Sequence, residues 1–375
     1  MRWSEESSAW VILSRTPGLD AGSLERALAL LGGAQGIVAA SEAARSGAGI
    51  PDAARRFLST ARICPAERDW LASPHHHVIP FTDPRYPSLL GTHRRRPITL
   101  YLAGDPAVLG LPQLAIVGSR NPTPQGREAA RRFSRQLAQD GLVITSGLAA
   151  GIDAEAHRGA LDGGGRTLAV LGAGVDVIYP RAHRDLHRDI EAGGAALSTF
   201  PLGTKPRRTH FPRRNAVIAA LTLGTLVIEA AESSGSLITA TMARRRGKVV
   251  LAVPGSIENP LSRGCHRLIR EGAVLVQSAH DIWRELRSSL PCAAVGPAQD
   301  RSDAAAISGT GMDKNRKILL DALGFDPADL DRLVDRTGWK PEAVSSMMLI
   351  LELEGHVQAA PGGRYSRVAR SRGER

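Results

Sequence analysis

The stretch Leu114–Leu161, LAIVGSRNPTPQGREAARRFSRQLAQDGLVITSGLAAGIDAEAHRGAL, indicates the fold. Two short apolar runs, at 114–117 and 142–145, are typical of buried parallel strands. Each run ends in a loop rich in glycine and serine, and apolar residues at helical spacing follow each loop. The stretch therefore predicts two consecutive strand–loop–helix units.

The two loops have the composition of an anion site. Parallel strands end at the same edge of a sheet, so backbone N–H groups and helix N-termini would point the same way there. An Arg directly after the first strand adds a planar fork that suits phosphate. Tight packing also explains glycine-rich turns, so a purely structural interpretation stays open. The candidate phosphate-binding residues are Gly118, Ser119, Arg120, Ser146, Gly147 and Gly151.

Further strand-like runs at 167–171, 195–199, 225–228, 249–253 and 274–275 alternate with helical patterns. This alternation predicts an α/β fold with a Rossmann-like, doubly wound parallel sheet. Ligands of such sheets bind outside the carboxyl ends of the strands. The two glycine loops, Gly172, Glu229, Ser234 and Gly235 should therefore share one edge, which we call the rim.

The net charge of +11 and a pI near 10.3 predict a polyanionic partner, with nucleic acid ahead of an acidic membrane surface. An Arg-rich composition that follows genomic base content is the alternative. No apolar run approaches the roughly 20 residues of a membrane span, and the N-terminus has no secretory pattern. Three widely spaced cysteines, Cys64, Cys265 and Cys292, predict reduced thiols and a cytoplasmic protein without a metal or cofactor.

Residues 204–215, TKPRRTHFPRRN, are the strongest nucleic-acid signal, and we call them the basic loop. Cations that surround an exposed aromatic suit single strands, because phosphates are neutralised while a base stacks. The alternative is that the aromatic residue is a buried anchor for the loop. The candidate residues are Lys205, Arg207, Arg208, Phe211, Arg213, Arg214 and Asn215.

Composition divides the chain into four parts. Residues 1–75 predict a small helical domain of the SAM or helix-hairpin-helix type, and 76–290 the Rossmann-like DNA-binding domain. Residues 291–312 are small and polar, as in a linker. Residues 313–375 predict three helices and a two-stranded wing, the outline of a winged helix. We expect His75–His77 to be a solvated loop, not a metal site.

Several motifs, in this order, resemble the DNA-processing protein A (DprA/Smf) family over about Phe81–Leu286: Gly118-Ser-Arg120, Ser146–Asp153, Tyr179-Pro180, Phe211–Asn215, Glu229-Ala230, Ser234–Ala240 and Pro254-Gly255. The resemblance implies a protein that binds single-stranded DNA taken up during natural transformation, protects it and helps load the RecA recombinase. It implies a homodimer built through the Rossmann-like domain, and no catalysis. By motif, Gly118, Ser119 and Arg120 would belong to the phosphate pocket, and Arg208, Phe211, Arg214 and Asn215 to a basic, base-stacking lip.

The chain departs from the family pattern at Ala216, at His183 and in the segment Ser198–Pro201. Two other functions stay open. One is a phosphoribohydrolase-like enzyme that cleaves nucleotides, although Pro254-Gly-Ser256 lacks the Thr and Glu that should follow. We expect Asp153 to cap its helix and Glu229 to hold the basic loop.

The other open function is a duplex-DNA regulator that acts through the winged helix. Its presumed recognition helix, Glu342–Glu354, has little base-reading chemistry, so we expect this module to contact protein. Arg364, Arg367 and Arg370 would then give at most backbone contacts. Apolar content alone makes Ser236–Arg246 a candidate face for the second subunit or for RecA.

Overall fold

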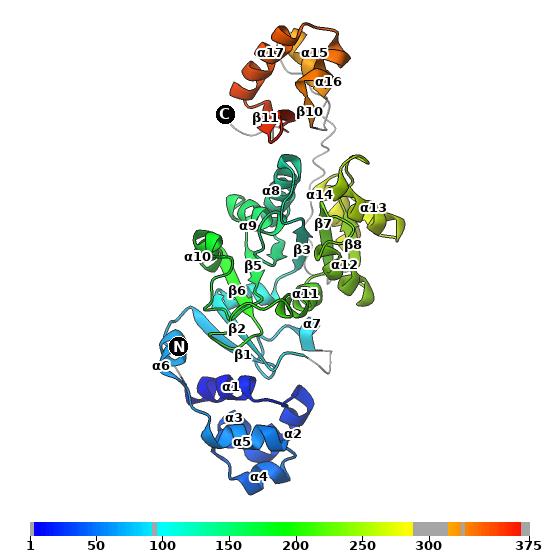
Figure 1. Cartoon of the computed structure of the whole chain (residues 1–375). Helices are drawn as coiled ribbons and strands as arrows, with labels where there is room; N and C mark the ends of the chain where they lie inside the picture. Colours follow the sequence, from blue (N-terminus) through cyan, green and yellow to red (C-terminus); the bar gives the residue numbers. More distant parts are fainter. Residues whose placement is uncertain (1–3, 92–95, 288–313, 324–326, 369–375) are drawn as a thin grey trace. The chain divides into compact units, whose positions relative to one another are not determined.

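The computed structural model describes residues 4–91, 96–287, 314–323 and 327–368 (Figure 1). The chain divides into two units, Met1–Asn121 with Ala130–Leu290, and Pro122–Ala129 with Pro291–Arg375. The helical N-terminal segment and the sheet fall in one unit. The predicted boundaries near residues 75, 290 and 312 therefore stay predictions.

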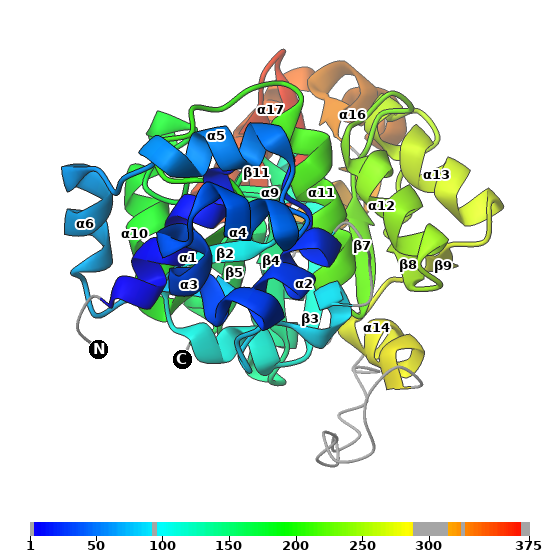
Figure 2. The ribbon, with the colours of Figure 1, turned by 90° about the horizontal axis from the view of Figure 1, so that it is seen from below.

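The N-terminal segment is a bundle of short helices, drawn in blue in Figure 2. Its second helix begins at a capping box formed by Asp20 and Ser23 and ends at Gly32, which has φ +76°. Trp10, which is buried in the bundle core, also contacts Phe81 edge-on at the start of the sheet region. The helices are α1 (Glu5–Arg15), α2 (Ala21–Leu31), α3 (Gly33–Ala39), α4 (Glu42–Gly47), α5 (Asp52–Thr60) and α6 (Pro65–Leu71).

A nine-stranded sheet has the order β1-β2-β6-β5-β4-β3-β7-β8-β9. From β6 to β9 all neighbours are parallel, which confirms the predicted doubly wound α/β sheet. The strands are β1 (His76–Pro80), β2 (Thr99–Gly104), β3 (Gln113–Gly118), β4 (Val143–Ser146), β5 (Thr167–Val170), β6 (Gly194–Ser198), β7 (Gly224–Ile228), β8 (Val249–Ala252) and β9 (Val274–Leu275).

The first two strands pair antiparallel with each other, and β2 pairs antiparallel with β6. The solvated loop expected at His75–His77 is therefore wrong, because His76 and His77 lie in β1. The His76 ring stacks on Trp70 at 4.4 Å, and its Nδ1 lies 2.7 Å from the Trp70 carbonyl oxygen. These contacts fix β1 to α6.

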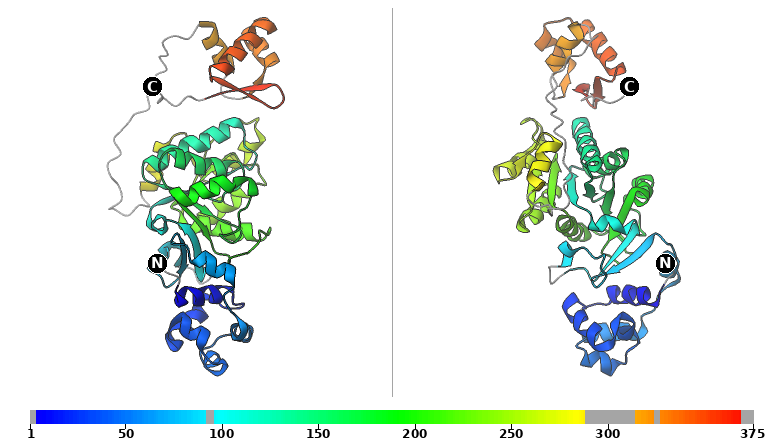
Figure 3. Two further views of the ribbon diagram at one scale, coloured as in Figure 1. Left: turned by 90° about the vertical axis from the view of Figure 1, so that its left-hand side faces the viewer. Right: turned by 180° about the vertical axis from the view of Figure 1, so that it is seen from behind.

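Each face of the sheet packs in its own hydrophobic core, as the alternating side chains of β5 show. Leu168 and Val170 pack in one core with Ile218 and Leu221, while Ala169 packs in another with Ile190. Figure 1 shows α8, α9 and α10 together on one side of the sheet, while α12 and α13 lie beside β7 and β8. The right-hand view of Figure 3 shows the same two groups from behind. The helices and 3₁₀ turns are α7 (Ser88–Gly91), η1 (Pro106–Gly110), α8 (Pro124–Gln139), α9 (Ile152–Asp162), η2 (Arg181–His183), α10 (Arg184–Gly193), α11 (His210–Leu221), α12 (Ser236–Arg245), η3 (Pro260–Ser262), α13 (Arg263–Arg270) and α14 (Ala279–Leu286).

The strand order reverses direction at β3. From β3 the chain passes to β4, β5 and β6 on one side and then returns to β7 on the other. The carboxyl ends of β3 and β7 therefore mark the topological switch point, where ligands of open α/β sheets bind. The predicted rim lies at this switch point.

The C-terminal unit has the predicted winged-helix outline. Leu333, Val344, Met348 and Leu351 form its buried core, with Val357 from the wing. Its elements are α15 (Lys314–Leu323), β10 (Ala328–Asp329), α16 (Leu330–Thr337), α17 (Pro341–Leu353), β11 (Val357–Ala360) and β12 (Arg364–Arg367). The linker predicted at 291–312 and Arg370 lie outside the described residues.

Candidate nucleic-acid interface

Close backbone packing shapes the first rim loop. A Cβ on Gly118 would lie 1.9 Å from the Ile228 carbonyl oxygen, so only glycine fits between β3 and β7. The Ser119 N–H donates to the Glu229 carbonyl at 2.6 Å, and the Ser119 hydroxyl accepts from the Asn121 N–H at 3.1 Å. Arg120, by contrast, is exposed. The loop is thus a tight support that presents Arg120 to solvent.

The second rim loop is largely occupied by protein contacts. The Ser146 hydroxyl donates to the Ile116 carbonyl at 2.6 Å, and the Gly147 N–H donates to Asp153 Oδ2 at 3.1 Å. Gly151 has φ +82°, and a Cβ there would lie 2.3 Å from the Ser119 carbonyl oxygen. Ser146, Gly147 and Gly151 therefore build the rim, and the hydroxyl and the N–H named here already have protein partners.

Asp153 does not cap its own helix, so that expectation is wrong. Its Oδ2 accepts from the N–H groups of Gly147 and Ala149, which precede α9, and lies 3.7 Å from Arg214 Nη1. The two charged side chains are only 9 % and 5 % exposed. Burial raises the pKa of Asp153 and lowers that of Arg214, while the opposite charge of each partner works the other way.

Arg214 consequently does not belong to the solvent-facing lip that the sequence predicted. Its guanidinium fills the space above Gly147, where a Cβ would lie 1.0 Å from Nη1. A buried cation paired with a carboxylate fixes the position of its helix and presents no charge to a ligand. We therefore treat Arg214 as a positioning residue.

Phe211 lies in the first turn of α11, because this helix starts at His210, three residues earlier than the pattern indicated. The Phe211 ring packs over Gly172, where a Cβ would be 3.1 Å from the ring edge. The guanidinium carbons of Arg120 and Arg214 each lie 5.8 Å from its centroid. The sequence left two interpretations of this ring open, an exposed stacking surface and a buried anchor. The ring is half-buried, so its exposure lies between the two.

The other residues of the basic loop supply the exposed charge. Arg213 lies over the Phe200 ring at 5.4 Å, and Asn215 donates weakly, at 3.5 Å, to the Gly235 carbonyl at the start of α12. Ser234 bonds to Ser236, 2.7 Å between hydroxyl oxygens, which fixes the same turn. The exposed cations of the loop are Lys205, Arg207, Arg208 and Arg213.

Glu229 has a left-handed backbone, φ +48°, at the carboxyl end of β7. Its Oε1 accepts from the Asn259 amide at 3.4 Å. A non-glycine residue in this conformation is strained by about 1–3 kcal/mol, which the surrounding hydrogen bonds must hold in place. This hydrogen bond joins Glu229 to the loop after β8, and the expected role of Glu229 in holding the basic loop stays a prediction.

Two residues beside the candidate site were not among the predicted site residues. Asp153 organises the second rim loop, and only its distance from Arg214 in the folded chain reveals the pair. Tyr179 lies beside Phe211, with ring centroids 6.0 Å apart, and its side chain is exposed. The Tyr179-Pro180 motif was a signal, but nothing in the sequence indicated that the ring faces solvent.

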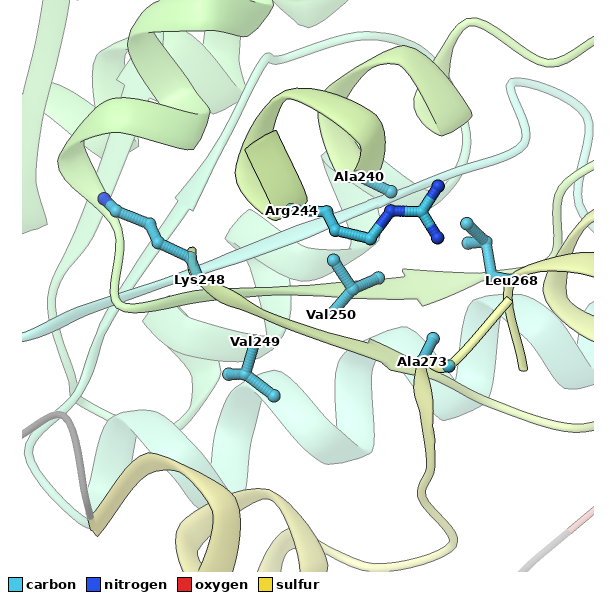
Figure 4. Close-up of a pocket in the computed structure, with 8 residues that line it drawn as sticks. Ala240, Arg244, Lys248, Val249, Val250, Leu268 and Ala273 are labelled. Carbon is cyan, nitrogen blue, oxygen red and sulfur yellow. The ribbon is translucent and has the colours of Figure 1, made fainter. Parts of the chain in front are cut away.

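A pocket of about 120 Å³ lies away from these residues, between α12, β8 and α13. Figure 4 shows Arg244 extending from α12 towards Leu268, with Val250 and Ala273 on the floor. Lys248 donates to the carbonyls of Ala220 and Thr222, and burial lowers its pKa to about 8. None of the predicted site residues lines this pocket, which lies on the face that contains Ser236–Arg246.

The winged-helix unit presents apolar, not basic, chemistry on its third helix. Leu349 and Leu353, one turn apart on α17, are 57 % and 80 % exposed. On the wing, Arg364 is exposed, while Arg367 donates to the Leu320 carbonyl at 3.4 Å. Among the described residues, no helix is both long and apolar enough to cross a membrane.

The chain is therefore a Rossmann-like protein with exposed cations near the switch point of a doubly wound sheet, and it also has a winged helix. The family model for DNA recombination-mediator protein A matches residues 77–287, and the model for the DprA winged helix domain matches residues 298–363. The chain belongs to the DNA recombination-mediator protein A (DprA/Smf) family, which confirms the resemblance drawn from its motifs.

Known relatives cover most of the chain. Protein Smf of Escherichia coli K12 is 40 % identical over 325 residues, 85 % of this chain and 84 % of that protein. The solved structure of DprA from Streptococcus pneumoniae covers 76 % of this chain and 99 % of that chain, with 34 % identity and a TM-score of 0.63. A structure of the Helicobacter pylori protein, solved to describe its single-stranded DNA binding mode, has 27 % identity and a TM-score of 0.52 and covers 58 % of this chain and 97 % of that chain.

Proposed function

We propose that this chain binds single-stranded DNA along the rim, with the phosphates on the exposed cations and a base against Phe211. One observation carries the proposal: α11 places Phe211 beside Arg120, within the segment that holds the exposed cations of the basic loop. Cations beside an accessible ring suit an unpaired strand, because a base in a duplex is already stacked on its neighbours. The Helicobacter pylori relative, which binds single-stranded DNA, supports the same ligand.

We extend the proposal to the biological role that the family suggests. The chain would protect DNA that enters the cell during natural transformation, help load the RecA recombinase on it, and act without catalysis. It would work as a homodimer through the Rossmann-like domain, and the face around Ser236–Arg246 is a candidate contact surface. The exposed leucines on α17 favour a protein partner for the winged helix over duplex DNA.

The central test is the affinity of labelled single-stranded and duplex oligonucleotides across a salt series. Arg120→Ala and Arg208→Ala should each weaken single-strand binding, and each should lower the slope of log K against log salt by about 0.7 per lost phosphate contact. Arg166→Ala is the matched control, because Arg166 precedes β5 at the opposite edge of the sheet and pairs with Asp105. A preference for duplex that neither rim variant changes would contradict the proposal.

Three further measurements address the wider role. RecA-dependent ATP hydrolysis on DNA coated with a single-strand-binding protein should accelerate when the chain is added. Sedimentation equilibrium should give a mass of twice 39.8 kDa. Incubation with nucleoside monophosphates should release no free base. Base release would instead support the phosphoribohydrolase-like alternative.

A further inference from the structure

Tyr179 is the most exposed Phe, Tyr or Trp side chain in the described part of the chain, at 48 %. It lies between β5 and η2, two residues before Arg181, and therefore on the carboxyl side of the sheet with the rim. Burial of an aromatic ring against a ligand is strongly favourable in free energy. A single exposed aromatic side chain is nevertheless common on protein surfaces and does not by itself indicate a site. Its position relative to Phe211 and the basic loop is what makes it informative.

The backbone that carries Tyr179 is tied to the basic loop and to the second rim loop. The Gly203 N–H donates to both carboxylate oxygens of Asp176, at 2.9 and 2.8 Å, and the Gly174 N–H donates to the Thr204 carbonyl at 2.8 Å. On the other side, His183 Nδ1 lies 3.1 Å from the Leu148 carbonyl oxygen. The ring is therefore exposed on a fixed support, which lowers the entropy lost when a ligand covers it.

The two rings cannot hold one base between them. A stacked base lies about 3.5 Å from a ring, so a sandwich needs parallel rings about 7 Å apart. The centroids of Tyr179 and Phe211 are 6.0 Å apart, and the ring planes are inclined by 48°. Each ring instead offers its own face to a different base. Arg181, exposed two residues after Tyr179, lies close enough in sequence to meet the phosphate of the outer nucleotide.

We propose that Tyr179 stacks on a second base of the bound strand, next to the base that contacts Phe211, and that this second platform sets the preference for unpaired bases. The inference rests on the proposed function, since it requires single-stranded DNA on the rim. Because the two ring planes are inclined, two bases that stack on them cannot also stack on each other. Paired and mutually stacked bases of a duplex do not meet this condition, whereas a flexible single strand does.

The first test compares Tyr179→Ala, Tyr179→Phe and Leu111→Ala for binding to single-stranded and duplex oligonucleotides. Tyr179→Ala should bind single strands about 5- to 140-fold more weakly, the range that corresponds to loss of one base–aromatic stack, with a smaller loss for duplex. Tyr179→Phe keeps the ring and should keep the affinity. Leu111 is an exposed apolar residue before β3, at the opposite edge, so Leu111→Ala should bind as the wild type does.

The second test uses a series of oligonucleotides in which a single abasic nucleotide is moved from one position to the next. In the wild type, the abasic nucleotide should weaken binding at two positions of the strand, one for each ring. In Tyr179→Ala the abasic nucleotide should have no further effect at one position and its full effect at the other, and Phe211→Ala should show the reverse. Additive losses at every position would mean that Tyr179 stacks on no base and would overturn the inference. Equal melting temperatures of the variants show that folding is intact.

The two proposals can fail separately. If the wild type does not prefer single strands, or if Arg120→Ala and Arg208→Ala bind like the wild type, the proposed function is wrong. If those variants lose affinity while Tyr179→Ala binds both DNA forms as the wild type does, only the second base platform is wrong.

Discussion

Removal of the Asp153 carboxylate tests how the rim is held together. In Asp153→Ala, the Arg214 guanidinium keeps its charge in the interior, because Arg is not deprotonated in proteins. The N–H groups of Gly147 and Ala149 also lose the oxygen to which they donate. Loss of one partner of a buried ion pair destabilises a protein by about 3–5 kcal/mol.

This free energy can be converted to a melting temperature. In a domain of roughly 200 residues each kcal/mol changes Tm by about 2–4 °C, so Asp153→Ala should melt about 6–20 °C below the wild type. Arg214→Met should be less harmful, because the remaining Asp153 keeps its backbone donors and can become neutral, which burial already favours. The double variant should recover part of the loss, since it buries no unpaired charge.

Differential scanning calorimetry of the full chain at pH 7.5 measures all four proteins under one set of conditions. We expect a strong, favourable coupling energy between the two substitutions. This expectation would be refuted if Asp153→Ala melted within about 2 °C of the wild type, or if the double variant lost as much stability as the two single variants together. Either result would mean that solvent reaches the pair.

Two other predictions concern stability. His157 is fully buried, and burial lowers its pKa to about 3, so the ring is neutral in the folded chain. The free energy of unfolding should be retained above the ordinary His pKa of about 6.5. Below that pH it should fall by about 1.4 kcal/mol per pH unit until the pH nears 3, because only the unfolded chain takes up the proton. His157→Gln should flatten the Tm profile between pH 7 and 4.5, and an unchanged slope would argue against this source of acid sensitivity. Gly151→Ala should lose about 3 kcal/mol or more in urea unfolding, from its φ of +82° and the contact with Ser119. Gly235→Ala, where φ is −62° and space is open, should change stability by less than about 0.5 kcal/mol, and equal losses in both variants would contradict the reasoning.

The parallel strands and their shared edge could be predicted because both depend on local patterns. Continuous apolar runs such as 114–117 identify strands that are buried on both faces. The chain direction then forces the loops after β3, β4 and β7 to the same edge, where the Ser119 N–H meets the Glu229 carbonyl. The resemblance to the DprA/Smf family could be recognised because the motifs in these loops occur in the order typical of the family.

The exposure of individual side chains could not be predicted in this way. Arg213 and Arg214 are neighbours of the same type, yet one is exposed and the other buried, because α11 starts early enough to turn position 214 towards Asp153. His76 and His77 form an edge strand, because β2 offers an antiparallel partner that lies far along the chain. Both outcomes depend on tertiary neighbours, which override local preference.

The start of α11 divides the proposed interface into a part that attracts a strand from a distance and a part that holds it after contact. Lys205, Arg207 and Arg208 precede the helix, and Phe211 lies within it, above the buried Arg214. Long-range attraction acts before contact and raises association rates, whereas short-range stacking on a fixed ring lengthens the lifetime of a complex. Salt should therefore change mainly how fast a strand arrives, and the ring on the helix how long it stays.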